Sequence, residues 1–243
     1  MPTTAPPEPR HDRPPSGDPV KPLPPGLWPA RVVHEGRYAR LEPLDARTHT
    51  SELYAASHAG EASASLWDYL SYGPFATEAA LHDWLREQTA IADPLFFAIR
   101  DKRTGAAAGV ASYLNIHPLA GSIEIGNIWF GPALQHTAAA TEALFLLLRH
   151  ALDELGYRRM EWKCNALNAA SRRAAVRLGF SFEAIFYQHL IVKGRNRDTA
   201  WFSILDGEWP RLRPAFETWL DPANFDDAGR QRTSLSTLTQ AAR

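Results

Sequence analysis

The chain has 243 residues, 45% of them hydrophobic, which is enough to bury one sizeable core, so a single domain with tails is expected. With 26 basic and 27 acidic residues the formal charge is −1. The chain therefore lacks the strong positive charge typical of nucleic-acid-binding proteins. The only cysteine, Cys164, excludes an internal disulfide, and no Cys and His residues stand at zinc-ligand spacing. We therefore expect a metal-free, cytoplasmic protein that does not bind nucleic acid.

Membrane insertion is not expected either. The longest wholly apolar run covers residues 143–148, whereas a membrane-spanning helix needs about 20 residues. The N-terminus also lacks the apolar core of a signal peptide.

The two ends differ in composition from the middle. Residues 1–25 hold ten of the 19 prolines and are predicted to form a disordered arm. Residues 221–243 are polar and are predicted to form a C-terminal tail, leaving residues 26–220 as the functional domain. Three apolar residues of the tail are candidates for docking on the domain: Phe225, Leu235 and Leu238.

Hydrophobic periodicity predicts the elements between these ends. In chain order they are a strand (38–43), a helix (45–58), a helix (77–92), three antiparallel strands (95–100, 107–116, 122–130), a helix (139–155), a strand (159–164), a helix (168–178), two strands (182–192, 199–205) and a helix (208–219). Gly126 is a candidate β-bulge position in the third of the antiparallel strands. This order predicts an α/β (α+β) fold in which helices flank a mixed sheet of about six to seven strands.

The strand-to-helix junction at residues 129–140 is the most informative stretch. Its small residues would let a ligand approach the backbone, and the free N–H groups of the first helical turn would bind a pyrophosphate. Alternatively, the alanines are simply good helix formers and Thr137 is only an N-cap.

A second pattern follows a strand at residues 165–180. Asn168 can cap the next helix, and Ser171 lies one turn later on the same helical face, so both can point at a ligand beyond the strand ends. Capping alone would also explain Asn168.

The two stretches, in this order, resemble the acetyl-coenzyme A motifs of the GNAT superfamily, and most closely its RimJ/RimL-like branch. That branch carries Asn-x-x-Ser followed by Leu-Gly-Phe, present here as Asn168–Ser171 and Leu178–Phe180. The superfamily's pyrophosphate loop aligns with residues 135–140, where Ala138 replaces the usual first glycine. Alanine lacks the φ freedom of glycine, so this substitution puts the details of phosphate binding in doubt.

The resemblance implies a mostly antiparallel GNAT sheet whose strands 122–130 and 160–164 splay to form a cleft for acetyl-CoA. The cofactor-binding residues that we predict are Ile128, Trp129, Phe130, Gln135, His136, Thr137, Ala138, Ala139, Ala140, Asn165, Asn168 and Ser171.

In such a cleft an amine attacks the thioester directly, so a base must accept a proton and the leaving thiolate must receive one. Glu124, on the cleft strand, is the candidate base, although it could equally be a surface carboxylate. Ser171 resembles the acid position of the RimL-like branch, and Tyr187 is a weaker candidate.

The connection at residues 66–75 is unusually aromatic and, in this superfamily, overhangs the acceptor pocket. Trp67, Asp68, Tyr69 and Tyr72 are therefore predicted to bind a cationic amine substrate, with packing as a satellite core as the alternative for at least two of them. Cys164 has no base near it in sequence and is interpreted as an unreactive buried thiol rather than a nucleophile.

The function that we predict is N-acetylation of a protein N-terminus, an amino acid or another small amine. A catalytically weak acyl-CoA-binding or interaction module is the alternative, suggested by Ala138 and by the long tails. A homodimer that buries the region of Phe216 and Trp219 is also considered.

Overall fold

The computed structural model describes residue 20 and residues 27–242. The disordered arm predicted for residues 1–25 lies, apart from Val20, outside the described residues. Across the part that is described, no helix is both long and apolar enough to cross a membrane.

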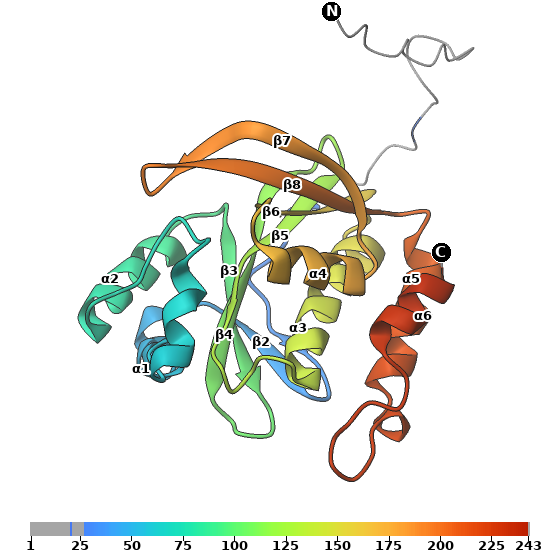
Figure 1. The fold of residues 1–243 in the computed structure, drawn as a ribbon, viewed down its shortest axis with the longest axis horizontal. Coiled ribbons are helices and arrows are strands. Elements are labelled where there is room, and N and C mark those ends of the chain that lie inside the picture. The colour runs from blue at the N-terminus through green and yellow to red at the C-terminus, as the bar shows by residue number, and fades with distance from the viewer. Residues whose placement is uncertain (1–19, 21–26, 243) are drawn as a thin grey trace, which may run out of the picture.

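One sheet of eight strands organises the molecule, in the order β1-β2-β3-β4-β5-β6-β8-β7 (Figure 1). The strands are β1 (His34–Glu35), β2 (Ala39–Pro43), β3 (Leu95–Asp101), β4 (Ala107–His117), β5 (Ser122–Phe130), β6 (Arg159–Asn165), β7 (Ser181–Val192) and β8 (Arg195–Leu205). All the pairings are antiparallel except that of β5 with β6. The mixed, mostly antiparallel sheet is confirmed, but the predicted count of six to seven strands is too low, because β1 has only two residues and leaves no periodic pattern.

Helices flank the sheet as predicted. They are α1 (Ala46–Ser57), α2 (Glu78–Thr89), α3 (Ala138–Arg149), α4 (Ala169–Arg177), α5 (Trp209–Leu220) and α6 (Leu235–Ala241), with short helical segments η1 (Glu61–Trp67), η2 (His150–Glu154) and η3 (Pro222–Asn224). Each of the first four helices is capped at its N-terminus by a side chain that accepts a hydrogen bond from a backbone N–H of the first turn. The capping residues are Asp45, Thr77, Thr137 and Asn168. These caps explain why residue patterns located the helix starts to within a residue or two.

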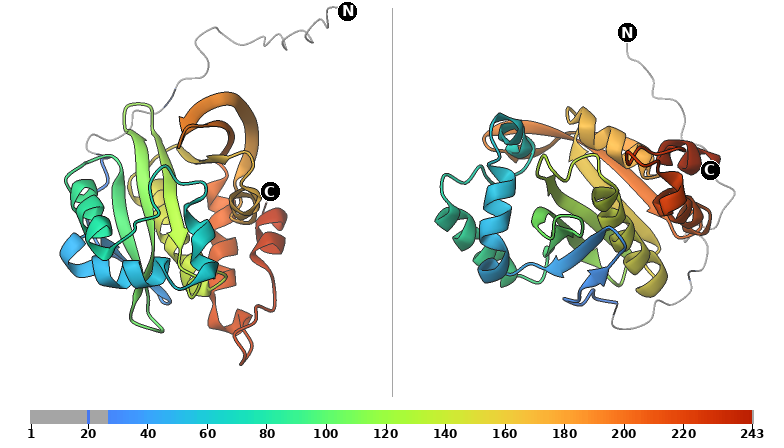
Figure 2. Two further views of the ribbon diagram at one scale, coloured as in Figure 1. Left: turned by 60° about the vertical axis from the view of Figure 1, so that its left-hand side comes forward. Right: turned by 90° about the horizontal axis from the view of Figure 1, so that it is seen from below.

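Alternation along the central strands divides the core into two layers (Figure 2). On β3, Phe97 belongs to the larger cluster, which lies against α3 and α5, while Phe96 on the opposite face belongs to a smaller cluster with α1 and α2. Both rings are buried, so neither face of β3 is open to solvent. The strand accordingly reads as a nearly continuous apolar run.

The C-terminal residues pack on the larger layer. Leu235 of α6 is fully buried there, and Phe225 and Leu238 pack partly buried against it, as their apolar character predicted. The domain limits at residues 26 and 220 themselves stay a prediction.

Phe216 and Trp219 of α5 are buried inside the chain's own core, where the Phe216 ring stacks on Phe145 at 5.2 Å between ring centroids. The proposed dimer contact through these two residues is therefore wrong, because α5 uses its apolar face to cover α3. Dimerisation itself stays a prediction.

Candidate active site

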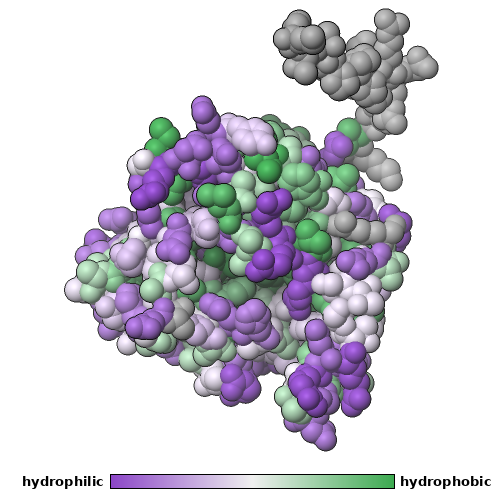
Figure 3. Space-filling view, viewed as in Figure 1, coloured by the Kyte–Doolittle hydropathy of each residue, from purple (hydrophilic) through white to green (hydrophobic). Residues whose placement is uncertain are grey.

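A cavity of about 2250 Å³ opens where β5 and β6 separate. The two strands pair in parallel over only three residues each, Ser122–Glu124 of β5 with Arg159–Glu161 of β6, and then diverge. A recess is visible beneath the β7–β8 hairpin in the space-filling view (Figure 3). The edge of β5 beyond Glu124 therefore faces the cavity with no strand beside it.

Irregular pairing of β4 and β5 accompanies the separation. The register between these strands shifts between Val110 and Ser112, opposite Asn127, which adopts a positive φ of 52°. The Asn127 side chain donates to the hydroxyl of Ser112 at 3.0 Å, and Tyr72 donates its hydroxyl proton to the carbonyl of Asn127 at 3.3 Å. The bulge predicted at Gly126 thus lies at the next residue.

The N-terminus of α3 forms one end of the cavity. Thr137 caps the helix by accepting from the N–H of Ala140 at 3.1 Å. Within the described part of the chain, the backbone N–H groups of His136, Ala138 and Ala139 have no hydrogen-bond partner. His136 has a φ of 61°, which bends the chain into the helix here. Unpaired N–H groups at a helix N-terminus fit an anionic group such as a pyrophosphate.

The start of α4 forms the opposite wall. Asn168 accepts from the N–H of Ser171 at 3.0 Å, so its capping role is present, and its side chain also lines the cavity. The hydroxyl of Ser171 accepts a hydrogen bond from the indole N–H of Trp162 on β6 at 3.0 Å. This bond leaves the Ser171 proton uncommitted, and the same hydroxyl also lies within hydrogen-bond reach of the Cys164 thiol. Asn165 uses its side-chain oxygen to hold the turn, accepting from the N–H of Leu167 at 2.9 Å.

Two arginines of α4 supply positive charge near these helix ends. Arg173 is exposed and Arg177 is half-buried, and both line the cavity. The Arg177 guanidinium donates to the hydroxyl of Thr141 on α3 at 3.2 Å and lies 5.0 Å from the ring centre of Trp219. Burial lowers the pKa of Arg177. Together with the free N–H groups of α3, these cations fit a phosphate-bearing substrate such as acetyl-CoA.

Glu124 lies where β5 and β6 part, and it is buried. Its carboxylate is 2.9 Å from the Lys163 ammonium and accepts from the side-chain amide of Asn115 at 2.6 Å. Burial raises the pKa of Glu124, while the charge of Lys163 and both hydrogen bonds pull it down. The alternative that Glu124 is a surface carboxylate is therefore wrong.

Lys163 is a site residue that sequence reasoning missed. It bridges Glu124 and Glu161 and holds its ammonium 4.1 Å from the ring centre of Trp201 on β8. Burial lowers its pKa, but the two carboxylates raise it by more. Only the pairing of β6 with both β5 and β8 brings these groups together, although the alternation along β6 could have placed Lys163 on the same face as Glu161.

The aromatic connection at residues 66–75 divides between the hydrophobic core and the cavity wall. Trp67 and Tyr72 belong to the smaller hydrophobic cluster and do not line the cavity, so their predicted contact with substrate is wrong, and the satellite-core alternative holds for both. Their apolar area is buried against Trp84, Phe75 and Trp129, where the Tyr72 ring stacks on Trp84 at 4.3 Å between centroids. Asp68 and Tyr69 are exposed and line the cavity.

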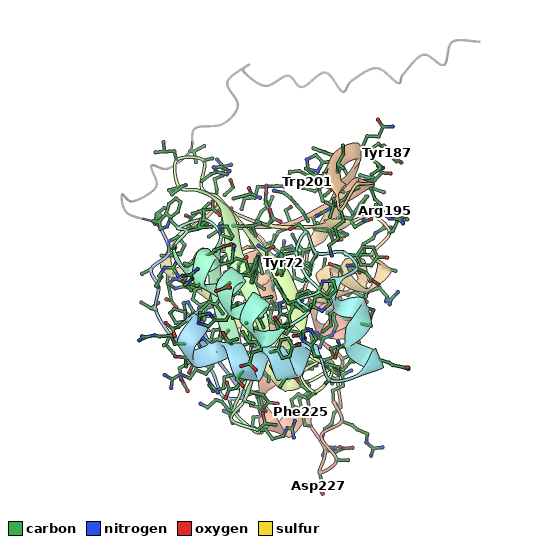
Figure 4. All side chains as sticks on the ribbon, turned by 90° about the vertical axis from the view of Figure 1, so that its left-hand side faces the viewer. Tyr72, Tyr187, Arg195, Trp201, Phe225 and Asp227 are labelled. Atoms are coloured by element: carbon green, nitrogen blue, oxygen red, sulfur yellow. The ribbon has the colours of Figure 1, made fainter. Side chains whose placement is uncertain are left out.

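Two other predicted groups are now located. Cys164 is a buried free thiol, and burial raises its pKa by more than its hydrogen bond with Ser171 lowers it, as expected for an unreactive cysteine. Tyr187 is 77% exposed on β7 and projects from the hairpin, away from Tyr72 (Figure 4). It does not line the cavity, so it is a poor candidate for the acid. Among the described residues, no group of three or more His, Cys, Asp or Glu could hold a metal ion.

The cavity unites both stretches that the sequence singled out. The predicted residues on its wall are Asp68, Tyr69, Glu124, Ile128, Trp129, Phe130, Gln135, His136, Thr137, Ala138, Ala139, Ala140, Asn165, Asn168 and Ser171. Gln135 turns its side chain back to the carbonyl of Phe130 at 2.9 Å.

Residues 40–181 match the family described as "Acetyltransferase (GNAT) domain". This chain belongs to the GNAT acetyltransferase family. A crystal structure of a GCN5-related N-acetyltransferase from Brucella melitensis is 49% identical, with a TM-score of 0.87 over 91% of this chain and 98% of that chain. The GNAT fold predicted from the sequence motifs is thereby confirmed.

The relatives are consistent with the RimJ/RimL-like branch. YdaF of Bacillus subtilis (strain 168), whose name assigns it provisionally to ribosomal N-acetylation, is 25% identical over 173 residues, or 70% of this chain and 90% of YdaF. The self-immunity acetyltransferase MccE, whose structure was solved with acetyl-CoA and AMP, shares the fold at 20% identity, with a TM-score of 0.61 over 70% of this chain and 93% of that chain.

In this GNAT chain the stretch predicted to be the pyrophosphate loop leads into a regular, capped helix despite Ala138. The residue opens α3 in ordinary helical conformation, and the positive φ falls instead at His136. No glycine is therefore required at position 138 for the loop to turn.

Proposed function

We propose that this chain transfers an acetyl group from acetyl-CoA to a primary amine by direct attack in a ternary complex. The observation that carries this proposal is the opening of β5 away from β6 at Glu124, which places a buried carboxylate beside a cavity walled by both cofactor motifs. Acetyl-CoA supplies the activated acetyl group. No covalent intermediate with the protein is needed.

The residues divide the work by position. The free N–H groups of α3, with Arg173 and Arg177, would hold the phosphates. The unpaired edge of β5 would align the pantetheine arm and donate N–H groups to the thioester oxygen as negative charge develops there.

Proton movement involves two groups. Glu124 would accept one proton from the acceptor's ammonium group, directly or through water, so that the neutral amine can attack, and its raised pKa suits a base that works near neutral pH. As the C–S bond breaks, the thiolate would take a proton from Ser171, whose hydroxyl is already oriented by Trp162.

Calorimetric titration with acetyl-CoA tests the cofactor site. The intact protein should bind at micromolar concentrations, and Ala138→Glu should abolish binding, because a carboxylate at the start of α3 repels phosphate while it remains compatible with the helix dipole. Ala55→Glu, the same change at an exposed position of α1, is the matched control and should bind normally.

Asn168→Asp is a second test variant. Aspartate retains the cap of α4 but brings negative charge to the cavity wall, so acetyl-CoA should bind more weakly. Absence of binding by the intact protein would refute the proposal. Tight binding with no release of CoA in the presence of any amine would instead identify a binding module.

A further inference from the structure

We propose that the amine acceptor carries its own carboxylate, as a free α-amino acid does, and that Arg197 binds that carboxylate with help from Trp201. The inference rests on the proposed acetyl transfer and names the substrate class for that reaction. It starts from two side chains of β8 that line the cavity but have no role in binding acetyl-CoA above.

Arg197 is a half-buried cation without a counter-ion. Its Nε atom is buried and has no hydrogen-bond partner, and no carboxylate forms an ion pair with it in the part of the chain that the structure describes. Burial lowers the pKa of this guanidinium, although Cys164 and Glu124 offset part of the effect. An uncompensated guanidinium in a cavity wall is costly unless a ligand supplies the anion.

Trp201 adds a second free donor. Its indole Nε1 is also buried without a partner. Residues 197 and 201 lie on the same face of β8, because side chains alternate along a strand, and both line the cavity. Neither of these two atoms has exposed surface of its own, so a ligand would meet the remaining N–H groups of the Arg197 guanidinium, which the two oxygens of a carboxylate match.

The phosphates of acetyl-CoA would lie at a different place. Their predicted contacts are at the start of α3 and on α4, whereas Trp201 pairs directly with Lys163 across β6 and β8. Lys163 in turn bridges to Glu124. The free donors of β8 therefore adjoin the predicted base rather than the phosphate end.

Charge balance fits a zwitterionic acceptor. Lys163 and Arg159 pair with three carboxylates, those of Glu124, Glu161 and Glu183, which leaves one negative charge to attract an ammonium group. Arg197 leaves positive charge for a carboxylate. In the reaction the ammonium loses one proton to Glu124, and the second moves through Ser171 to the leaving thiolate as the amide forms. The new N–C bond replaces the C–S bond, and CoA leaves as the thiol with an N-acetyl amino acid as the other product.

The experiment follows CoA release by the full-length protein with the twenty free L-α-amino acids and with their carboxamides. At least one amino acid should be used about tenfold or more efficiently, in kcat/KM, than its amide, because the amide lacks the anion. Arg197→Gln should raise KM for that amino acid about tenfold or more and leave turnover of the amide nearly unchanged.

Two controls accompany this variant. Arg195→Gln removes an exposed arginine from the same hairpin and should change neither substrate (Figure 4). Arg197→Lys retains charge and should recover part of the preference. Calorimetry should show unchanged acetyl-CoA binding in all three variants.

Equal use of amino acids and amides, or an equal loss for both in Arg197→Gln, would overturn this inference while the proposed acetyl transfer stands. Turnover only with peptide N-termini, in a protein that binds acetyl-CoA, would do the same. A failure to bind acetyl-CoA at all would overturn both.

Discussion

The carboxylate of Glu124 is buried, and two neighbouring side chains fix its orientation. Its carboxylate is 5% exposed and is held by Lys163 on one side and Asn115 on the other. The neighbouring Gly126 has little space for a side chain, since an added Cβ would lie 2.8 Å from Leu114. A carboxylate held this firmly would accept a proton from a defined direction if it acts as the proposed base.

Glu124→Gln should lower kcat about 100-fold or more, because the amide cannot accept the proton, while acetyl-CoA affinity stays unchanged. In the intact protein kcat/KM should fall as the pH drops through the raised pKa of Glu124, since protonation removes the base. The variant should lack that acidic decline. The measurement is the pH–rate profile of both proteins.

The control for this variant is Glu183→Gln, at a carboxylate that pairs with Arg159 outside the cavity. It should retain nearly full activity. A Glu124→Gln protein with normal kcat would show that water or another group removes the proton.

At the scale of elements, a single carboxylate joins α3 to the first strands. Glu142 is buried and accepts from the backbone N–H groups of Arg37 at 2.8 Å, Tyr38 at 2.5 Å and Ala39 at 2.7 Å. A Cβ at Gly36 would collide with this carboxylate, so the turn between β1 and β2 requires glycine for space. The link holds the helix whose N-terminus is predicted to bind phosphate.

Glu142→Ala should destabilise the fold by about 3 kcal/mol, because three backbone N–H groups, of which that of Ala39 is buried, lose their acceptor. Urea unfolding should show a lower midpoint with an unchanged slope. Glu217→Ala, which removes an exposed carboxylate from α5, should change stability by less than about 0.5 kcal/mol. Equal midpoints for the two variants would contradict the structural role of Glu142.

At the scale of the whole molecule, the core holds two histidines in contact. The rings of His34 on β1 and His150 on η2 are 4.5 Å apart, and the Nε2 atoms of both are buried without a partner. Burial, followed by the charge of His150, lowers the pKa of His34 from 6.5 to about 4. The folded protein therefore keeps His34 neutral at pH values where the unfolded chain protonates it.

This difference predicts a pH-dependent stability. The contribution of His34 is complete above about pH 6.5 and is lost as the pH falls from there towards 4, by at most about 3 kcal/mol. His34→Phe retains an aromatic ring that cannot titrate and should flatten the dependence of the urea midpoint on pH in this range. His117→Gln, at an exposed histidine, should leave the slope unchanged, and an unchanged slope in His34→Phe would refute the prediction.

Local patterns predicted the elements well, and they located the two stretches that the structure brings to one cavity. Caps such as Thr137 and Asn168 act within one turn, and the apolar patterns of β3 to β5 depend only on neighbours along the chain. Motifs in residues 129–140 and 165–180 were therefore readable before the fold was known. The eighth strand escaped because two residues carry no period.

Tertiary structure alone decided the environment of the chemistry. Whether Glu124 is a buried base or a surface carboxylate depends on Asn115 and Lys163, which come from β4 and β6. Trp67 turned into the core and Asp68 into the cavity, although they are adjacent in sequence. The sequence could not show that donors of Arg197 and Trp201 are unpaired either, because the neighbours of a side chain are known only when all the surrounding strands are in place. Burial, pairing and charge balance are sums over residues that are distant in sequence, and folding alone brings those residues together.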